Sequence, residues 1–162
     1  MTSFQLVGLS PEPFATLFDL PDVELGARNV QRVLATACPG FPCRVSLSDA
    51  EIGEELLLLP FEHQPARSPY RASGPIFVRR GASQARLAPG VMPDYVRLRL
   101  MSARAYDHAG HMADATVCDG NDAASAIQQM FSDDNVAYIH LHNAKRGCFS
   151  CLVNRVEPLQ FL

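Results

Sequence analysis

The stretch YIHLHNAKRGCFSC, residues 138–151, contains two of the five histidines and two of the five cysteines of the chain. Imidazoles and thiols bind transition metals, and they also act as bases and nucleophiles in catalysis. Three interpretations are therefore open: a metal site, a thiol activated by an imidazole, or a packed hairpin without chemistry. The elements that carry these residues decide which of the side chains can meet.

The two cysteines have the CxxC spacing of many structural zinc sites, which place the motif on a tight turn. Here Cys148 and Cys151 lie in an apolar run that is typical of a strand. Because residues three apart on a strand point to opposite faces, the two thiols are not expected to bind one ion. His140 and His142 do share a face, and with a third ligand they would form a less favoured, histidine-based metal site. The favoured interpretations contain no metal or other cofactor.

A hairpin with residues 143–147 as its loop would place His142 directly opposite Cys148, and His140 opposite Ser150. Cross-strand neighbours on one face have Cβ atoms about 4.5–5.5 Å apart. The other face of this hairpin carries apolar side chains and is expected to form the core. A slip of one residue in this register would separate the imidazole from the thiol.

In this register Cys148 and His142 form a candidate catalytic dyad, in which the thiol is the nucleophile and the imidazole is the base. Asn143 and Arg146 lie in the connecting loop, beside Lys145, and are candidate ligand-binding residues. The alternative is that the histidines are solvated or hydrogen-bonded and that the cysteine is a small packing residue. Both interpretations stay open at the level of the sequence.

A second candidate region follows residue 61, where residues 62–75 contain three prolines and show no periodicity. This pattern predicts a long loop, and long loops in compact domains are often functional. Arg71 and Arg79 could hold a carboxylate or phosphate through paired hydrogen bonds, and His63 and Ser73 are candidate ligand-binding residues beside them. The alternative is a rigid surface loop whose arginines are solvated.

The remaining elements predict one α+β domain over residues 1–162, with a mostly antiparallel sheet that is curved or partly closed. The main helix is expected at about 121–132, because apolar residues recur there at helical spacing. One or two short helices are expected near the N-terminus, at 10–18 and 21–28. Strands are predicted at 4–9, 29–36, 44–47, 56–61, 76–80, 95–107, 112–118, 136–142 and 148–156.

Composition narrows the possible partners. The chain has 162 residues, 48% of them hydrophobic and 19% charged, which is typical of a folded domain rather than a disordered one. Its net charge of −3 argues against binding to nucleic acid, and no apolar run is long enough to cross a membrane. No signal peptide is evident and the cysteine count is odd, so we expect a cytoplasmic protein with reduced thiols. The sequence does not specify an oligomeric state.

Four stretches resemble an uncharacterised bacterial family labelled domain of unknown function 1203: PGFPCRVSLSDAEIGEELLLL, SPYRASGPIFVR, ARAYD and HLHNAKRGCF. The resemblance implies a bacterial, single-domain protein, and the family brings no assigned activity. It also implies that both candidate regions belong to the common pattern of the family, with His63, Arg71, Ser73 and Gly74 in the first and His142, Asn143, Arg146, Gly147 and Cys148 in the second.

Taken together, the sequence favours a site for a small anionic ligand, or an enzyme-like site, built from the 62–79 loop and the 142–148 hairpin turn. The alternative function is a non-catalytic ligand-binding or interaction module in which Cys148 is structural. A metal site based on His140 and His142 is the third possibility.

Overall fold

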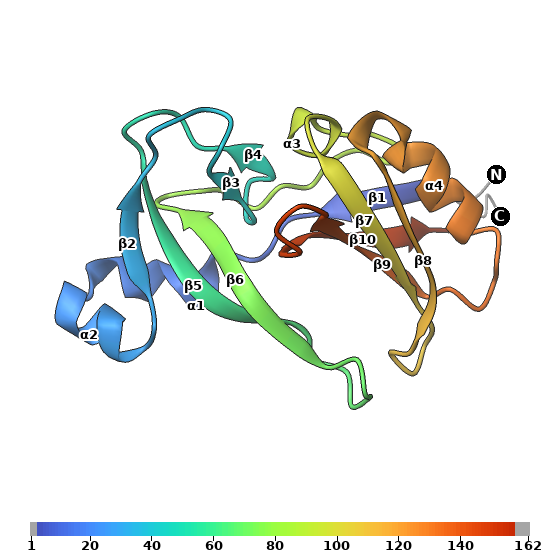
Figure 1. The fold of residues 1–162 in the computed structure, drawn as a ribbon, viewed down its shortest axis with the longest axis horizontal. Coiled ribbons are helices and arrows are strands. Elements are labelled where there is room, and N and C mark those ends of the chain that lie inside the picture. The colour runs from blue at the N-terminus through green and yellow to red at the C-terminus, as the bar shows by residue number, and fades with distance from the viewer. Residues whose placement is uncertain (1–2, 158–162) are drawn as a thin grey trace, which may run out of the picture.

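The computed structural model describes residues 3–157 and contains two five-stranded sheets that lie side by side (Figure 1). The strand order is β1-β10-β9-β7-β8 in the first sheet and β2-β5-β6-β3-β4 in the second. All pairs are antiparallel except β3–β6. The α+β class and the mostly antiparallel pairing are therefore confirmed, with the strands divided between two sheets.

The first sheet is formed by the first strand of the described chain and by the four strands between residues 100 and 156. Its strands are β1 (Ser3–Val7), β7 (Leu100–Tyr106), β8 (Met112–Asp119), β9 (Tyr138–Asn143) and β10 (Phe149–Val156). The second sheet is formed by the middle of the chain. Its strands are β2 (Gln31–Leu34), β3 (Pro42–Cys43), β4 (Ser48–Asp49), β5 (Glu55–Gln64) and β6 (Ala72–Arg79).

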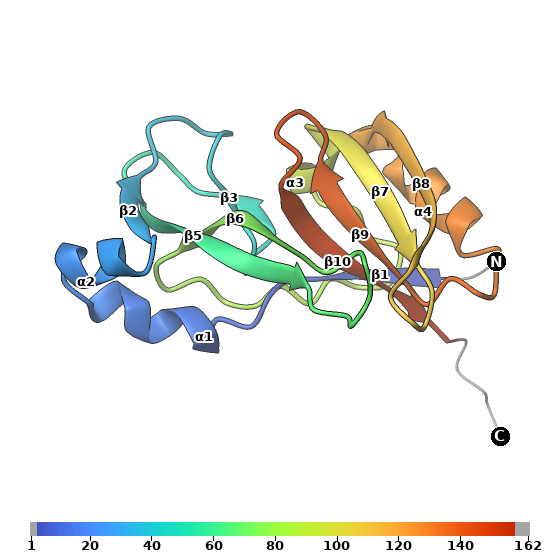
Figure 2. The same ribbon diagram turned by 60° about the horizontal axis from the view of Figure 1, so that its bottom comes forward.

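The helices are short and flank the sheets (Figures 1 and 2). The expected N-terminal helices are α1 (Glu12–Ala15), the 3-10 helix η1 (Thr16–Asp19) and α2 (Asp22–Ala27). The expected main helix is α4 (Ala123–Met130), which follows the 3-10 helix η2 (Gly120–Asp122). The carboxylate of Asp119 caps this segment by accepting from the backbone N–H of Asn121.

Each sheet has its own apolar core. One face of the first sheet packs against α4 through residues that alternate along the strands, such as Ala103, Ile139, Leu141 and Val153. The second sheet packs against the N-terminal helices through Leu57, Ile76 and their neighbours. The opposite face of β9, which carries His140 and His142, is therefore turned away from α4 and is free to meet the second sheet.

Three sequence predictions are wrong. Residues 62–75 are not a loop, because β5 extends to Gln64 and β6 begins at Ala72. Residues 95–107 are not one strand, because Asp94–Arg97 form a short helix, α3, before β7 begins. Pro93 gives this helix an extended N-cap, and Val96, which the alternation placed on a strand, is buried inside it. Residues 44–47 form a turn, in which Leu47 has a φ of 50° that no strand accommodates.

Among residues 3–157, the structure contains no helix with the length and apolar character that crossing a bilayer requires.

A charged network fastens the N-terminal helices to the second sheet. Glu55 in β5 accepts from both Arg32 and Arg80, and each of these arginines also donates to the Phe18 carbonyl at the end of η1. The hydrogen bond from the Arg32 guanidinium is the main reason that the pKa of the Glu55 carboxyl lies below its usual value.

We expect Glu55→Gln to destabilise the fold by about 1 kcal/mol at pH 7, because the network is only partly exposed. A lowered pKa contributes stability above the unfolded pKa, about 4.3, that is lost as the pH falls through the folded value. The difference between variant and wild type should therefore shrink below about pH 4. Urea denaturation at pH 7 and pH 3.5 measures both values, and an equal difference at the two pH values would contradict the assignment.

Candidate functional site

Two β-bulges deliver the central residues of the candidate site. In β5, Glu62 pairs with Ser73 and Gln64 pairs with Ala72, so His63 is an extra residue without a cross-strand partner. In β10, a second bulge leaves Ser150 unpaired. Bulges redirect side chains and are common beside functional sites. The bulge at His63 belongs to the second sheet, and the bulge at Ser150 belongs to the first sheet. The site therefore lies where the two sheets meet.

The imidazoles of His63, His140 and His142 converge at this junction. One ring nitrogen from each lies within 4.8 Å of the other two. His140 and His142 are 4% and 1% exposed, and His63 is half-buried. Three nitrogens about 2.0–2.1 Å from one tetrahedral zinc ion would be about 3.3 Å apart, so small ring rotations close the triangle.

Each of these imidazoles has a buried nitrogen that lacks a hydrogen-bond partner among residues 3–157: Nδ1 of His63, Nδ1 of His140 and Nε2 of His142. Buried polar atoms are nearly always paired, so an unpaired one calls for a partner such as a water, an ion or a ligand. Nδ1 of His142 lies 2.9 Å from the Gly147 carbonyl oxygen, to which it donates. This bond fixes the tautomer that leaves Nε2 with a free lone pair, as backbone carbonyls do for metal-binding histidines.

Aromatic rings hold the three imidazoles in place. The ring of Phe149 stacks on His63 with centroids 5.5 Å apart, and it meets His140 and His142 edge-on at 5.2 and 5.8 Å. Tyr106 and Tyr138 also pack against His140, with ring centroids 5.0 and 5.3 Å away. Because the rings are confined by packing, the nitrogens keep their convergent arrangement.

Hydrogen bonds between the two sheets fix the bulge that carries His63. The side chain of Gln64, which is buried, bonds to the hydroxyl of Tyr138 in β9. Farther along the β5–β6 turn, the hydroxyl of Ser68 donates to the Gly110 carbonyl in the β7–β8 turn at 2.8 Å. A Cβ at Gly110 would lie 2.3 Å from the Cβ of Ala66, so this close approach requires glycine.

Burial lowers the pKa of the His140 imidazole to about 3 and that of His142 to about 4, and it also lowers the pKa of His63. The positive charge of Arg104 acts in the same direction on all three rings. The rings are therefore neutral near pH 7, which is the form of imidazole that binds metal ions.

A cavity of about 310 Å³ opens beside His63 and His142. Ser73, Arg104, Arg146 and Cys148 contribute to its walls. The cavity therefore offers two guanidinium groups, a hydroxyl and a thiol next to the three imidazoles. This arrangement favours a small anionic molecule over a cationic one.

The predicted register of the β9–β10 hairpin is wrong. His142 pairs with Phe149 rather than with Cys148, and His140 pairs with Leu152 rather than with Ser150. The pairing is already shifted by one residue at His142, because the connection between the paired positions runs from 143 to 148. The bulge at Ser150 then shifts it by one more residue at His140. Between the two described side chains of His142 and Cys148 there is no hydrogen bond, so the structure does not form the predicted dyad.

The thiol of Cys148 has another partner, the buried guanidinium of Arg44, whose Nη2 donates to Sγ at 3.2 Å. Asn143 lies on the other side of the sulfur, with its Nδ2 at 3.9 Å. Cys151 is sealed in the apolar core, where burial raises the pKa of its thiol to about 12. The CxxC pair is thus divided between two environments, as the strand pattern predicted.

Two predicted ligand-binding arginines lie apart from both the histidines and the cavity. Arg71 forms an exposed ion pair with Glu62, and Arg79 forms a partly buried one with Glu54. Arg146 and Ser73 do line the cavity beside His63. The structure thus brings two of the predicted residues to this cavity, whereas Arg71 and Arg79, which were expected to hold an anion, form ion pairs within the second sheet.

Arg44 and Arg104 were not among the residues predicted from the sequence. Arg104 in β7 lies opposite His140 in β9, and Ser102 lies opposite His142, so the strand alternation contained a signal once the pairing was known. Arg44 is the largest fully buried side chain and follows a strand of only two residues. No local pattern distinguishes it from the other arginines of the chain.

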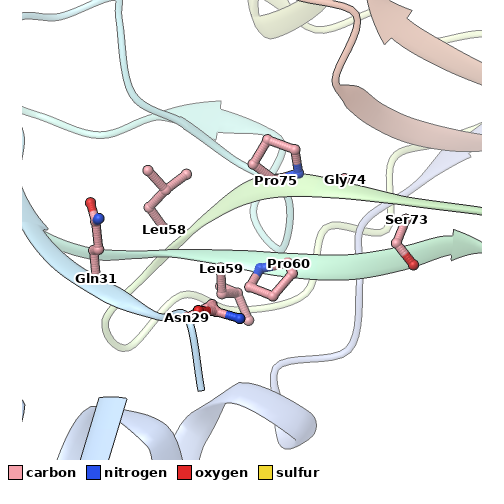
Figure 3. A pocket seen from close by; sticks show the side chains of 8 residues that line it. All are labelled: Asn29, Gln31, Leu58, Leu59, Pro60, Ser73, Gly74 and Pro75. Atoms are coloured by element: carbon pink, nitrogen blue, oxygen red, sulfur yellow. The ribbon is translucent and has the colours of Figure 1, made fainter. Parts of the chain in front are cut away.

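A separate depression, of about 370 Å³, lies over β2, β5 and β6 (Figure 3). Figure 3 shows Gln31 and Leu58 toward one end and Ser73 at the other. Its lining contains no ionisable side chain, so it offers neither acid–base groups nor metal ligands. Imidazole, guanidinium and thiol groups instead lie together at the junction of the two sheets.

Comparison with protein families matches residues 40–155 to the family described as Protein of unknown function (DUF1203). The chain belongs to this family. The match confirms the resemblance seen in the sequence, and it includes the three histidines, Arg44, Arg104 and Cys148. Searches of curated proteins and of solved structures found no match. The DUF1203 assignment therefore names the family, and the geometry of the site must carry the function.

Proposed function

We propose that this DUF1203 protein binds a divalent transition-metal ion through His63, His140 and His142. The observation that carries the proposal is the convergence of three ring nitrogens within 4.8 Å, each on an imidazole with an unpartnered buried nitrogen. Three neutral imidazoles suit zinc, copper, iron, cobalt or nickel, and they do not suit the oxygen-preferring ions magnesium and calcium.

The site has the composition of catalytic rather than structural metal centres. Structural zinc sites use four protein ligands, whereas catalytic sites use three and leave a position open. Here the imidazoles adjoin the cavity that contains Arg104 and Arg146. A bound ion would supply Lewis-acid polarisation or an activated water. The two guanidinium groups of the chain would orient an anionic substrate. Phe149, Tyr106 and Tyr138 would exclude water from the site.

We therefore propose an enzyme-like site for a small anionic substrate, which develops the expectation drawn from the sequence. The alternative is a non-catalytic metal-dependent binding module with the same ligands, in which Cys148 has a structural role. We also propose a cytoplasmic location, which the five free cysteines support because thiols stay reduced there.

Metal analysis tests the proposal directly. We expect purified protein to contain about one transition-metal ion per chain, and a chelator to remove it. Adding Zn²⁺ to the metal-free protein at about 100 times its Kd should stabilise the fold by about 2.7 kcal/mol, or about 5–10 °C in Tm for a chain of this length.

Mg²⁺ and Ca²⁺ are the controls for that titration and should produce no shift, because they prefer oxygen ligands. Metal content of only a few per cent after growth with added zinc, together with no change in Tm on adding Zn²⁺, Co²⁺, Ni²⁺, Cu²⁺ or Fe²⁺, would overturn the metal centre.

A further inference from the structure

A second, larger cavity of about 520 Å³ lies on the other side of the turn between β9 and β10. It shares Arg146 and Cys148 with the cavity beside the histidines, but none of the three histidines lines it. Four of its lining side chains are basic: Arg44, Arg99, Lys145 and Arg146. Lys145 is the only lysine in the chain.

The basic groups around this cavity are only partly neutralised. Arg99 makes a two-pronged ion pair with Asp49, which accounts for one positive charge. For Arg44, Lys145 and Arg146, no ion pair with a carboxylate exists within residues 3–157. Three positive charges therefore face one cavity in a chain whose net charge is −3. A cavity with low-dielectric walls concentrates such a field and attracts anions.

The positive charge of Arg44 is held in a fixed position by burial and hydrogen bonds. Its side chain is 1% exposed, and its Nε and Nη1 donate to the carbonyls of Phe149 and Pro42, each at 2.7 Å. Burying a charge without a paired countercharge is costly, so such an arrangement is stabilised when an anion occupies the cavity. Asn143 adds a second sign of a missing partner, because its Oδ1 is buried without a hydrogen-bond donor.

The opposite wall of the cavity is apolar. Phe41 and Phe77 pack with ring centroids 5.3 Å apart, and Leu98 and Leu100 complete the wall. Leu98 and Leu100 are 63% and 44% exposed, so they present apolar surface that the carbon skeleton of an organic ligand would cover. An inorganic anion would use the basic end only, whereas an organic anion would use both walls.

We propose that this cavity binds a small organic anion, with its carboxylate or phosphate near Arg44, Lys145 and Arg146 and its apolar part against Phe41 and Phe77. A ligand that carries an O–H or N–H group beside its anionic group would also donate to the unpaired side-chain Oδ1 of Asn143. Because no histidine lines the cavity, binding at this site does not depend on the metal centre.

Calorimetric titration of chelator-treated protein tests the site with four probes: phenyl phosphate, benzoate, inorganic phosphate and the neutral benzamide. We expect phenyl phosphate or benzoate to bind, and the tighter of the two identifies the anionic group. Inorganic phosphate should bind at least ~10-fold more weakly than phenyl phosphate, and benzamide should not bind. Equal binding of benzoate and benzamide, or binding of neither aromatic anion, would overturn the proposal.

A matched pair of variants locates the site. Lys145→Met removes one exposed charge from the cavity and should weaken binding of the aromatic anion by about 10-fold. Arg67→Met removes one exposed charge that lines neither cavity, and it should leave the affinity unchanged. If both variants bind as wild type does, the anion binds elsewhere and the proposal fails.

Cys148 provides a second readout, because its thiol lines the cavity. A saturating aromatic anion should slow its alkylation by iodoacetamide several-fold, while alkylation of the exposed Cys38 should not change. Both thiols can be followed in one sample by peptide mass spectrometry. Equal alkylation rates of Cys148 with and without a bound anion would contradict the placement. Because all these measurements use metal-free protein, they can succeed or fail separately from the metal centre.

Discussion

His140→Ala should lower the affinity of the protein for Zn²⁺ by at least ~100-fold, because it removes one of three ligands. Loss of a partner that merely orients a ligand already costs about 10–100-fold. His63→Ala should have an effect of the same order, although His63 comes from the other sheet. Competition with a chromogenic chelator measures the affinities, and the absorption spectrum of bound Co²⁺ reports whether the remaining ligands keep their geometry.

The chain offers matched controls for these substitutions. His108 and His111 lie exposed in the β7–β8 turn, and replacing either with alanine should leave Zn²⁺ affinity within a factor of two. His63 is half-buried, so His63→Ala is expected to fold even if His140→Ala is too unstable to purify. If His63→Ala binds Zn²⁺ as tightly as His108→Ala does, the three-histidine centre is wrong.

The sequence predicted the elements of the first sheet better than the meeting of the two sheets. The alternation along 136–142 correctly placed His140 and His142 on one face, with Ile139 and Leu141 toward the core. The helical spacing of apolar residues at 123–131 correctly predicted α4. Both signals are local, since each depends only on the period of one element.

The candidate site depends on features that have no local signature. His63 was predicted to be a ligand-binding residue in a loop. Its position beside His140, which is 77 residues later in the chain, depends on a bulge in β5 and on contact between the two sheets. The turn between β9 and β10 is likewise one residue longer than predicted, so His142 pairs with Phe149 rather than with Cys148, and the bulge at Ser150 adds a second shift at His140. Prolines at 65, 69 and 75 suggested irregular structure, yet Pro75 lies within β6 and Pro65 and Pro69 lie in the short turn between the strands. These features depend on which strands pair and in which register, and residue types alone do not specify that pairing.

Arg44→Met should destabilise the protein by about 2–4 kcal/mol, because the guanidinium joins the two sheets at the candidate site. The substitution keeps an apolar side chain of similar length but leaves the carbonyls of Pro42 and Phe149 buried without these donors. An unsatisfied buried group costs about 1–3 kcal/mol, and removal of a buried charge offsets part of that loss. The expected decrease in Tm is about 5–15 °C for a chain of this length.

Arg44→Lys and Arg97→Met separate the possible causes of that loss. Lysine keeps the charge but cannot reproduce the fork that reaches two carbonyls and the thiol of Cys148, so Arg44→Lys should also lose at least ~1–2 kcal/mol. Arg97 is half-exposed on α3, and its replacement should change stability by less than about 0.5 kcal/mol. Urea denaturation of the three variants gives the free energies. An Arg44→Met protein as stable as Arg97→Met would mean that the sheets are held together without this guanidinium, and that the positive charge it places beside Cys148 serves the ligand alone.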